Sequence, residues 1–354
     1  MPEAECRPSR DPVLPRRKRG ALALTCALLS ACGGGAPDPL PYDGIGAYVE
    51  AERFVGTIVV KQGDRILLRA SHGFADAARQ TPNALDTRYC IASLTKAFTA
   101  LGVVALKGED RIAGYDAALS DILPGYPRGD ELTLRHLLTH RSGIPDYRAD
   151  ADPDRAYTPG ELVDLFKDRP LAFAPGEGFD YSNANYVLLG QVIETLGGEP
   201  YAAFLRSRIL VPFGLADTGY GDDEPAGQRD ALGYADLAQT RRANHLDMSI
   251  PYAAGALVST ADDLVAFAES FADPARVSAE DAAEIFGDAS YGFGWVISRL
   301  AGRPVRGHTG GIDGFSAMLV VFPEQDAIVV ALSNVENEQA KLQRIAATIA
   351  EHEF

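Results

Sequence analysis

Apolar residues follow a strand pattern near both ends of the chain and a helical pattern between them. Near the start, the segment FVGTIVVKQGDRILLRASHGFAD (54–76) predicts two strands joined by a turn at residues 62–64. After about residue 290, strands are again predicted in YGFGWVIS, PVRGHTGG and SAMLVVFPEQDAIVVALSN, with a turn over 323–326. A last helix is predicted over 337–354.

Helical spacing dominates the middle of the chain. A long apolar helix is predicted to open at Ser93, and ALVSTADDLVAFAESF predicts another with Ser259 or Thr260 as its N-cap. Further helices are predicted in ELTLRHLLTH, TPGELVDLF, NANYVLLGQVIETLG and YAAFLRSRIL. Strands from both chain ends with helices between them predict an α+β fold of the α/β-sandwich type. An antiparallel sheet would be flanked by helices, with a mainly helical subdomain inserted over approximately 116–240.

The N-terminus has the pattern of an export signal. The basic group RRKRG is followed by the short apolar run ALALTCALL and by small residues, which predicts a secretory signal peptide too short to span a bilayer. The ending Leu29-Ser30-Ala31-Cys32 resembles the lipobox of bacterial lipoproteins, which implies lipidation at Cys32. An ordinary signal peptide with an incidental cysteine is the alternative.

This interpretation divides the chain into a lipoprotein signal peptide (1–31), a Gly/Pro-rich flexible tether (32–45) and one domain (46–354). It predicts a protein that is secreted across the inner membrane and held to a membrane by lipid. The domain would face the periplasm or the cell exterior.

Composition narrows the partners that the domain could have. The chain of 354 residues is 46% hydrophobic and 23% charged, as in soluble globular proteins, and its net charge of -16 argues against a nucleic-acid partner. Only Cys90 would remain as a free cysteine in the mature chain, so no internal disulfide is expected, and nothing resembles a metal cluster. No cofactor is expected. Cys90 is expected to be a buried apolar residue, the alternative being a nucleophile without a cationic neighbour in sequence.

A serine and a lysine stand three residues apart in IASLTKAF (91–98). On a helix this spacing places Ser93 and Lys96 on one face. A serine hydroxyl needs a base to take its proton, and burial disfavours the charged form of a lysine, so Lys96 could be that base. The alternative is a capping serine beside an exposed lysine.

A second motif is FDYSNANY, which holds Tyr181 and Asn183. A tyrosine on a loop can relay a proton, and an asparagine can bind a substrate amide. The alternative is Asn183 as the N-cap of the helix that follows, with Tyr181 packed nearby.

A third motif is RGHTGGIDGF, which holds His308, Thr309, Gly310 and Gly311 on or after a predicted strand. Small residues there would let a substrate lie against the backbone, and a free N–H could stabilise an oxyanion. A glycine-rich turn is the alternative.

The order S-x-x-K, Y-x-N and then a [K/H]-T-G-like strand resembles the serine β-lactamase and penicillin-binding-protein superfamily. More specifically, it is similar to the class C β-lactamase-related serine hydrolases, which include esterases and D-alanyl-D-alanine peptidases. The segments LTLRHLLTHRSGIPDY, PGEGFDYSNANYVLLG, AAGALVSTADDL and YGFGWVIS are also typical of that family, so the resemblance runs from about residue 45 to the end.

The resemblance implies a role for each motif residue. Ser93 would be the acylated nucleophile, and Lys96 would accept its proton. Tyr181 would protonate the leaving group and later activate the deacylating water. Asn183 would hold the acyl side of the substrate, and the backbone N–H groups of Ser93 and Gly311 would form the oxyanion hole.

The same resemblance places His308, Thr309 and Gly310 against the substrate. His308 stands where β-lactamases and carboxypeptidases of the superfamily carry lysine. A histidine with a pKa near 6.5 would be mostly neutral at pH 7, which argues against strong β-lactamase activity. If protonation of His308 aided carboxylate substrates, their turnover would rise below about pH 6.5 relative to neutral esters.

Two rival interpretations come from other classes of protein. His136 and His140 are four apart on one predicted helix face, as metal ligands can be, but Leu137 stands where the zinc-protease motif needs glutamate. A non-catalytic, lipid-anchored binding or sensor protein could also use this fold. The complete set of motif residues argues against it.

The sequence therefore predicts a serine hydrolase that acts through a covalent acyl-enzyme on a small ester or a peptide, with a true β-lactamase as the alternative. The pocket walls are expected to come from loops such as 146–160 and 218–245.

Overall fold

The computed structural model describes residues 41–221, 229–287 and 289–354. The predicted signal peptide (1–31), the lipidation site Cys32 and most of the tether lie outside the described residues. Within the described ranges, no helix combines the length and the apolar character that crossing a membrane requires.

The two terminal strand blocks share one antiparallel sheet, as predicted. Its six strands lie in the order β2-β1-β11-β10-β9-β8, so strands from the two ends of the chain pair inside the sheet, with Thr57 opposite Leu332. The strands are β1 (Gly56–Gln62), β2 (Arg65–His72), β8 (Val296–Leu300), β9 (Arg303–Ile312), β10 (Phe315–Phe322) and β11 (Ala327–Ser333).

Both faces of this sheet are buried. Ile58 and Val60 of β1 belong to one apolar cluster, whereas Val59 between them belongs to the other. Successive side chains of a strand point to opposite faces, so a strand buried on both faces needs a continuous apolar run such as AIVVAL in β11.

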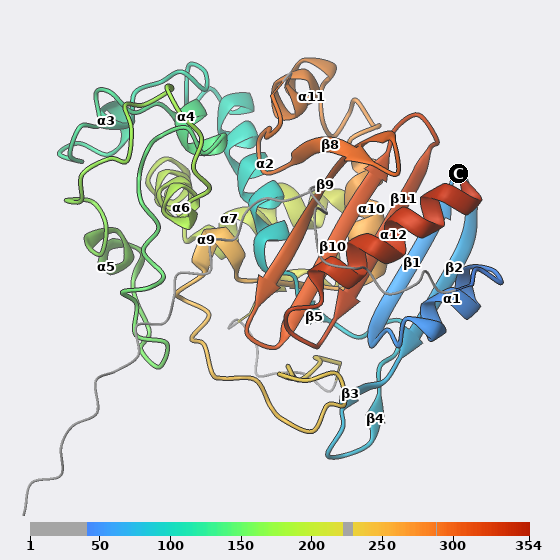
Figure 1. The fold of residues 1–354 in the computed structure, drawn as a ribbon. Helices are drawn as coiled ribbons and strands as arrows, with labels where there is room; N and C mark the ends of the chain where they lie inside the picture. The colour runs from blue at the N-terminus through green and yellow to red at the C-terminus, as the bar shows by residue number, and fades with distance from the viewer. Residues whose placement is uncertain (1–40, 222–228, 288) are drawn as a thin grey trace, which may run out of the picture.

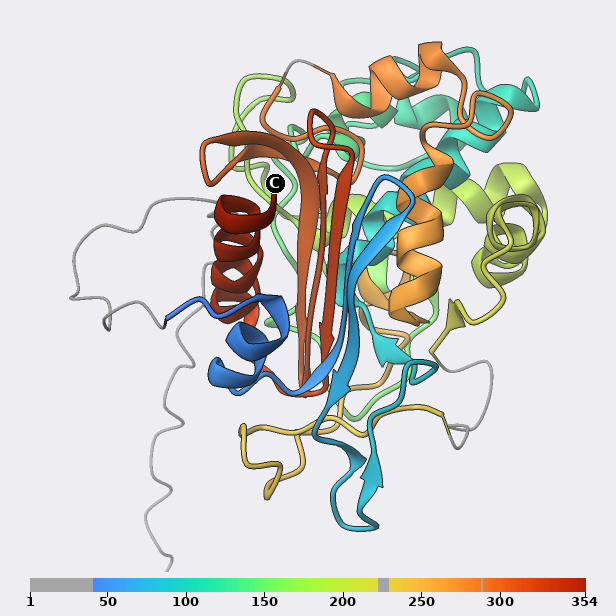
Figure 2. The same ribbon diagram turned by 90° about the vertical axis from the view of Figure 1, so that its right-hand side faces the viewer.

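Helices cover the two faces (Figures 1 and 2). The helices α1 (Ile45–Ala51) and α12 (Gln339–Glu353) lie on one face, and α2 (Thr95–Gly108) and α10 (Ala261–Ser270) lie on the other. The sequence pattern did not predict α1. Thr260 caps α10, because its side chain accepts a hydrogen bond from Asp263 N.

The remaining helices gather on the α2 side of the sheet, and most belong to the predicted insertion (Figure 1). They are α3 (Leu119–Ile122), α4 (Leu134–Leu138), α5 (Pro159–Asp164), α6 (Asn183–Gly197), α7 (Tyr201–Leu205), α8 (Val211–Phe213), α9 (Tyr252–Gly255) and α11 (Ala279–Phe286). A π-helical turn over Arg206–Leu210 joins α7 to α8.

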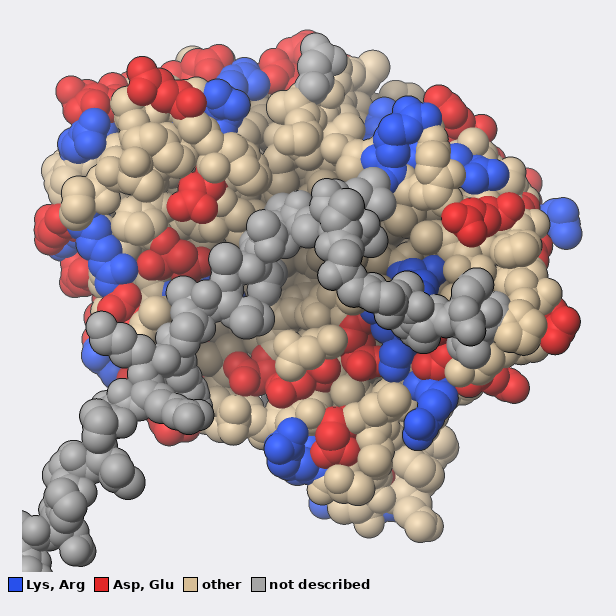
Figure 3. Space-filling view, viewed as in Figure 1, with Lys and Arg blue, Asp and Glu red and all other residues tan. Residues whose placement is uncertain are grey.

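Two small sheets complete the described structure. One pairs β3 (Phe74–Asp76) with β4 (Thr81–Pro82), and the other has the order β5 (Tyr89–Cys90), β7 (Leu257–Ser259), β6 (Gly219–Tyr220). Cys90 is buried, as predicted. In Figure 3, acidic and basic side chains are interspersed over the visible face rather than gathered into one patch.

Candidate active site

The side chains of Ser93 and Lys96 meet at the start of α2. Ser93 lies in a 3-10 helix, Ala92–Leu94, that leads directly into α2, so the predicted helix does not itself begin at the serine. Lys96 is fully buried, and its Nζ lies 3.0 Å from Ser93 Oγ. The expectation that this lysine is buried rather than solvated is confirmed.

Two carbonyl oxygens hold the other side of the Lys96 amine. Its Nζ donates to Asn183 Oδ1 at 2.8 Å and to the backbone oxygen of Ala254 at 2.7 Å. A carbonyl oxygen can only accept, so these two contacts use two N–H bonds in either protonation state. The remaining position on the Lys96 nitrogen faces Ser93 Oγ, and in the neutral amine this position is the lone pair.

The phenol of Tyr181 approaches the same serine from the loop before α6. Its hydroxyl donates to Ser93 Oγ at 2.9 Å, and Lys96 Nζ lies 4.9 Å from the centre of its ring. Asn183 is the first residue of α6 rather than its N-cap, and its side chain makes no capping bond. The tertiary structure thus brings all four residues of the first two motifs together.

Asp146 is a site residue that the sequence analysis missed. Its Oδ2 accepts from Asn183 Nδ2 at 2.6 Å and from Asn183 N at 3.3 Å, and its Oδ1 accepts from Arg148 N at 2.9 Å. Burial alone would raise the pKa of Asp146, but the Arg148 cation and these N–H donors hold it below the usual value. The segment SGIPDY carried this signal only as part of the family resemblance.

The third motif lies on β9, next to the 3-10 helix of Ser93. An added Cβ on Gly310 would stand 2.3 Å from the backbone oxygen of Ile91, so only glycine allows this approach. Gly311 lines the same cavity as Ser93 and pairs with Ser316 of β10. The motif is therefore a strand, not a turn.

His308 is buried and neutral. Its Nδ1–H donates to the backbone oxygen of Thr309 at 2.6 Å, which leaves Nε2 to accept from Tyr291 OH at 3.1 Å. Burial lowers the pKa of His308 to about 3, and a positive charge on the nearby Lys96 acts in the same direction. With this pKa His308 stays neutral near pH 6.5, which argues against the expected gain of carboxylate turnover below about pH 6.5, and the gain itself stays a prediction.

The two histidines of the metal hypothesis do not share a helix face. The helix α4 ends at Leu138, and His140 follows in a left-handed conformation with φ of 56°. His136 Nδ1 accepts from Thr133 N and closes the capping box of α4. No group of three or more His, Cys, Asp or Glu residues that could hold a metal occurs in the described part of the chain.

His140 instead orders the Tyr181 loop. Its Nδ1 accepts from Ser182 N at 3.2 Å and from Asn185 Nδ2 at 3.1 Å, and its ring lies 4.3 Å from the Tyr181 ring between centroids. Burial first, and then Lys96 and His308, lower its pKa well below the ordinary value. The His140 imidazole therefore holds the Tyr181 loop through a hydrogen bond to Ser182 and through packing against the Tyr181 ring.

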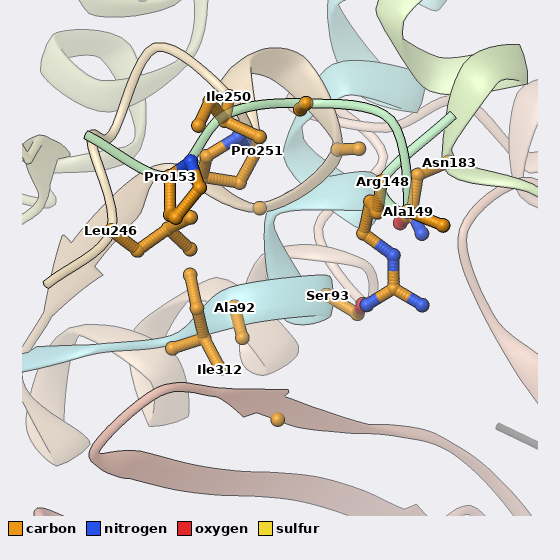
Figure 4. A pocket seen from close by; sticks show the side chains of 14 residues that line it. Ala92, Ser93, Arg148, Ala149, Pro153, Asn183, Leu246, Ile250, Pro251 and Ile312 are labelled. Carbon is orange, nitrogen blue, oxygen red and sulfur yellow. The ribbon is translucent and has the colours of Figure 1, made fainter. Parts of the chain in front are cut away.

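A cavity of about 890 Å³ opens over Ser93. Figure 4 shows a polar end with Ser93, Asn183 and Arg148. The opposite end is apolar and is lined by Pro153, Leu246, Ile250, Pro251 and Ile312. The prediction that loop 146–160 forms a wall is confirmed. The second wall comes from residues 246–255, just beyond the predicted 218–245, within the described residues.

One known family matches most of the chain. A sequence model of the Beta-lactamase family matches residues 45–353. The chain belongs to the beta-lactamase family. This match confirms the resemblance that the three motifs indicated.

Individual members of the beta-lactamase family are similar to this chain along most of their length. The chain is 31% identical over 334 residues to penicillin-binding protein 4* of Bacillus subtilis (strain 168), covering 86% of this chain and 73% of that protein. A penicillin-binding protein from Bacillus halodurans aligns with a TM-score of 0.78 and 26% identity, covering 86% of this chain and 98% of that one. A D-amino acid amidase from Ochrobactrum anthropi SV3, solved with L-phenylalanine, aligns with a TM-score of 0.77 and 27% identity. The alignment covers 85% of this chain and 94% of the amidase.

Proposed function

We propose that the protein hydrolyses an ester or an amide through a covalent acyl-enzyme on Ser93. The observation that carries this proposal is the environment of Lys96. Its Nζ lies 3.0 Å from Ser93 Oγ, and the carbonyl oxygens of Asn183 and Ala254, which can only accept hydrogen bonds, hold the amine in this position. The reaction would be of the esterase or D-alanyl-D-alanine peptidase type.

In acylation, Ser93 Oγ attacks the substrate carbonyl carbon while its proton passes to Lys96 Nζ. The bond to the leaving group then breaks, and the leaving group takes the proton of Tyr181 OH, which lies against the same Oγ. The developing oxyanion would receive hydrogen bonds from the backbone N–H groups of Ser93 and Gly311. The enzyme is left with a Lys96 ammonium and a Tyr181 phenolate.

Deacylation returns both protons. The Tyr181 phenolate takes a proton from a water molecule, whose hydroxide attacks the acyl carbon. The bond to Ser93 Oγ breaks, and Oγ recovers its proton from Lys96. The hydrogen bond from Tyr181 OH to Ser93 Oγ, at 2.9 Å, supports this tyrosine as the group that activates water.

The substrate class separates the remaining candidates. His308 stands where β-lactamases of the superfamily carry lysine, and it leaves that position without a charge, so we propose a small ester or a peptide ahead of β-lactam hydrolysis. A non-catalytic binding or sensor protein on the same fold remains the rival of another class. We further propose, on the N-terminal pattern alone, that the protein is a lipoprotein modified at Cys32 and facing the periplasm or cell exterior.

Intact-protein mass spectrometry tests the chemistry. The protein would be exposed to an activated p-nitrophenyl ester, a D-Ala-D-Ala peptide and a chromogenic cephalosporin, with the S93A variant as control. We expect an acyl adduct on the wild-type protein with the ester or the peptide, and none on S93A. The absence of any Ser93-dependent adduct or turnover with all three would favour the binding protein.

A further inference from the structure

Arg148 brings a positive charge to the mouth of the candidate active site. It is the one Lys or Arg side chain among the described residues that line the cavity, and Figure 4 shows its guanidinium directed at Ser93. Its side chain is 47% exposed, so a ligand can reach it. Neither the position nor the residue type belongs to the three motifs that indicated the hydrolase.

The contacts of Arg148 direct its terminal nitrogens into the cavity. Its Nε lies 3.4 Å from Asp146 Oδ2, whereas that oxygen already accepts two hydrogen bonds from Asn183. The terminal nitrogens of Arg148 donate to no acceptor in the part of the chain that the structure describes. A guanidinium with two such donors matches a carboxylate in a bidentate geometry.

The other cationic candidates near Ser93 cannot serve a substrate in this way. Lys96 is fully buried, and its amine is held by Ser93, Asn183 and Ala254. His308 is neutral because burial and Lys96 lower its pKa to about 3. Arg148 therefore supplies the positive charge at the polar end of the cavity.

We propose that Arg148 binds a carboxylate that the substrate carries within a few bonds of its scissile carbonyl. Arg148 would thus select anionic esters or peptides, with the substrate's apolar group directed toward Leu246 and Ile312 at the far end of the cavity. Substrates with a free ammonium at the same place would be repelled, because like charges at short range disfavour binding. This inference rests on the proposed acyl-enzyme hydrolysis at Ser93.

The carboxylate could belong to the acyl group or to the leaving group, and matched substrate pairs distinguish the two. On the acyl side, mono-p-nitrophenyl succinate is compared with p-nitrophenyl butyrate, which has a methyl group in place of the carboxylate. On the leaving-group side, N-acetyl-D-Ala-D-Ala is compared with its C-terminal amide. The rate with S93A is subtracted from each measurement to remove spontaneous hydrolysis.

The variants are R148Q, R148K and the control R155Q, which removes the same charge from an exposed arginine in the same loop region. In one of the two pairs, we expect R148Q to lower kcat/KM about ten- to a hundredfold for the anionic member. The kcat/KM of R148Q for the neutral member of that pair should change by less than about threefold. R148K should retain part of the preference, because a lysine keeps the charge but not the fork geometry. R155Q should leave kcat/KM unchanged for both members of each substrate pair.

Two results would overturn the proposal. An equal loss for anionic and neutral members in R148Q would assign Arg148 to the support of Asp146 rather than to substrate binding. An unchanged preference in R148Q, in a protein whose thermal unfolding is unaltered, would exclude the carboxylate contact. Both results leave hydrolysis at Ser93 standing, whereas the absence of a Ser93 adduct on the wild-type protein would end the proposed function and this inference together.

Discussion

Asp146 determines which end of the Asn183 side-chain amide faces Lys96. The Asp146 carboxylate accepts from Asn183 Nδ2 at 2.6 Å, and the opposite end of the same amide accepts from Lys96 Nζ at 2.8 Å. If the amide turned over, an N–H₂ group would face the Lys96 amine, and the carbonyl would face a carboxylate. Both contacts would then be repulsive.

Removal of Asp146 should therefore impair catalysis without removing a reacting group. We expect D146A to lower kcat about tenfold or more while changing KM less, because a charge-assisted hydrogen bond that holds Asn183 is lost. D146N keeps one acceptor oxygen and should retain more activity. The measurement is a kcat and KM comparison with D150A, an exposed carboxylate of the same loop region that pairs with Arg169. Equal effects of D146A and D150A would contradict a positioning role.

Replacement of Lys96 tests its role as the base. The K96M variant fills a similar volume but cannot take the Ser93 proton, so we expect kcat to fall by about 10²- to 10⁴-fold. K107M, near the other end of α2, is the matched control and should stay close to wild type. Circular dichroism must show that K96M is folded, because Asn183 Oδ1 and Ala254 O lose a buried donor. A folded K96M with wild-type kcat would exclude the proposed proton transfer.

Replacement of Gly310 tests the close approach of β9 to the nucleophile. In G310A the new methyl group would stand 2.3 Å from the Ile91 backbone oxygen, and overpacking of this kind costs about 1–3 kcal/mol. We expect a lower midpoint of denaturant unfolding together with reduced acylation of Ser93. The control is G46A in α1, where nothing lies within 4 Å of the added methyl group and stability should be unchanged or higher. Equal midpoints for G310A and wild type would show that the strand can move away without cost.

The buried His308 should make the stability depend on pH. Its pKa falls from about 6.5 in the unfolded chain to about 3 in the fold, so between these values the unfolded chain binds the extra proton. The stability that His308 contributes is therefore complete above pH 6.5 and is lost as the pH falls toward 3. When the pH falls from 7.5 to 5, we expect the free energy of unfolding of wild type to decrease by about 2 kcal/mol more than that of H308Q. Denaturant unfolding checks this, with H352Q at the exposed C-terminus as control; parallel curves for wild type and H308Q would contradict it.

The neutral state of His308 also leads to a prediction about the pH dependence of substrate preference. From pH 5 to pH 8, the ratio of kcat/KM for anionic and neutral members of a substrate pair should stay constant, because His308 carries no charge anywhere in that range. Steady-state kinetics with the succinate and butyrate esters provide the measurement. A ratio that rises on acidification with a midpoint near pH 6.5 would show that His308 is protonated in the working enzyme.

Local patterns determined most of the fold and the chemical motifs. The short, β-branched apolar run of β11 and the turn before it predicted a buried strand, and the helix α6 follows from its apolar spacing. Ser93, Lys96, Tyr181 and Asn183 were recognisable because their types and spacing suit acyl transfer. Helix ends were less well determined, since capping geometry decided between Ser259 and Thr260.

Tertiary structure decided what these groups can do. Asp146 and Arg148 are ordinary loop residues in sequence, and only the packing of their loop against α6 and the cavity places them beside Asn183 and Ser93. Likewise, no pattern in the chain reveals that His308 stays neutral well below pH 6.5. Its charge state depends on burial and on the distance to a lysine more than two hundred residues away, and both are properties of the folded chain alone.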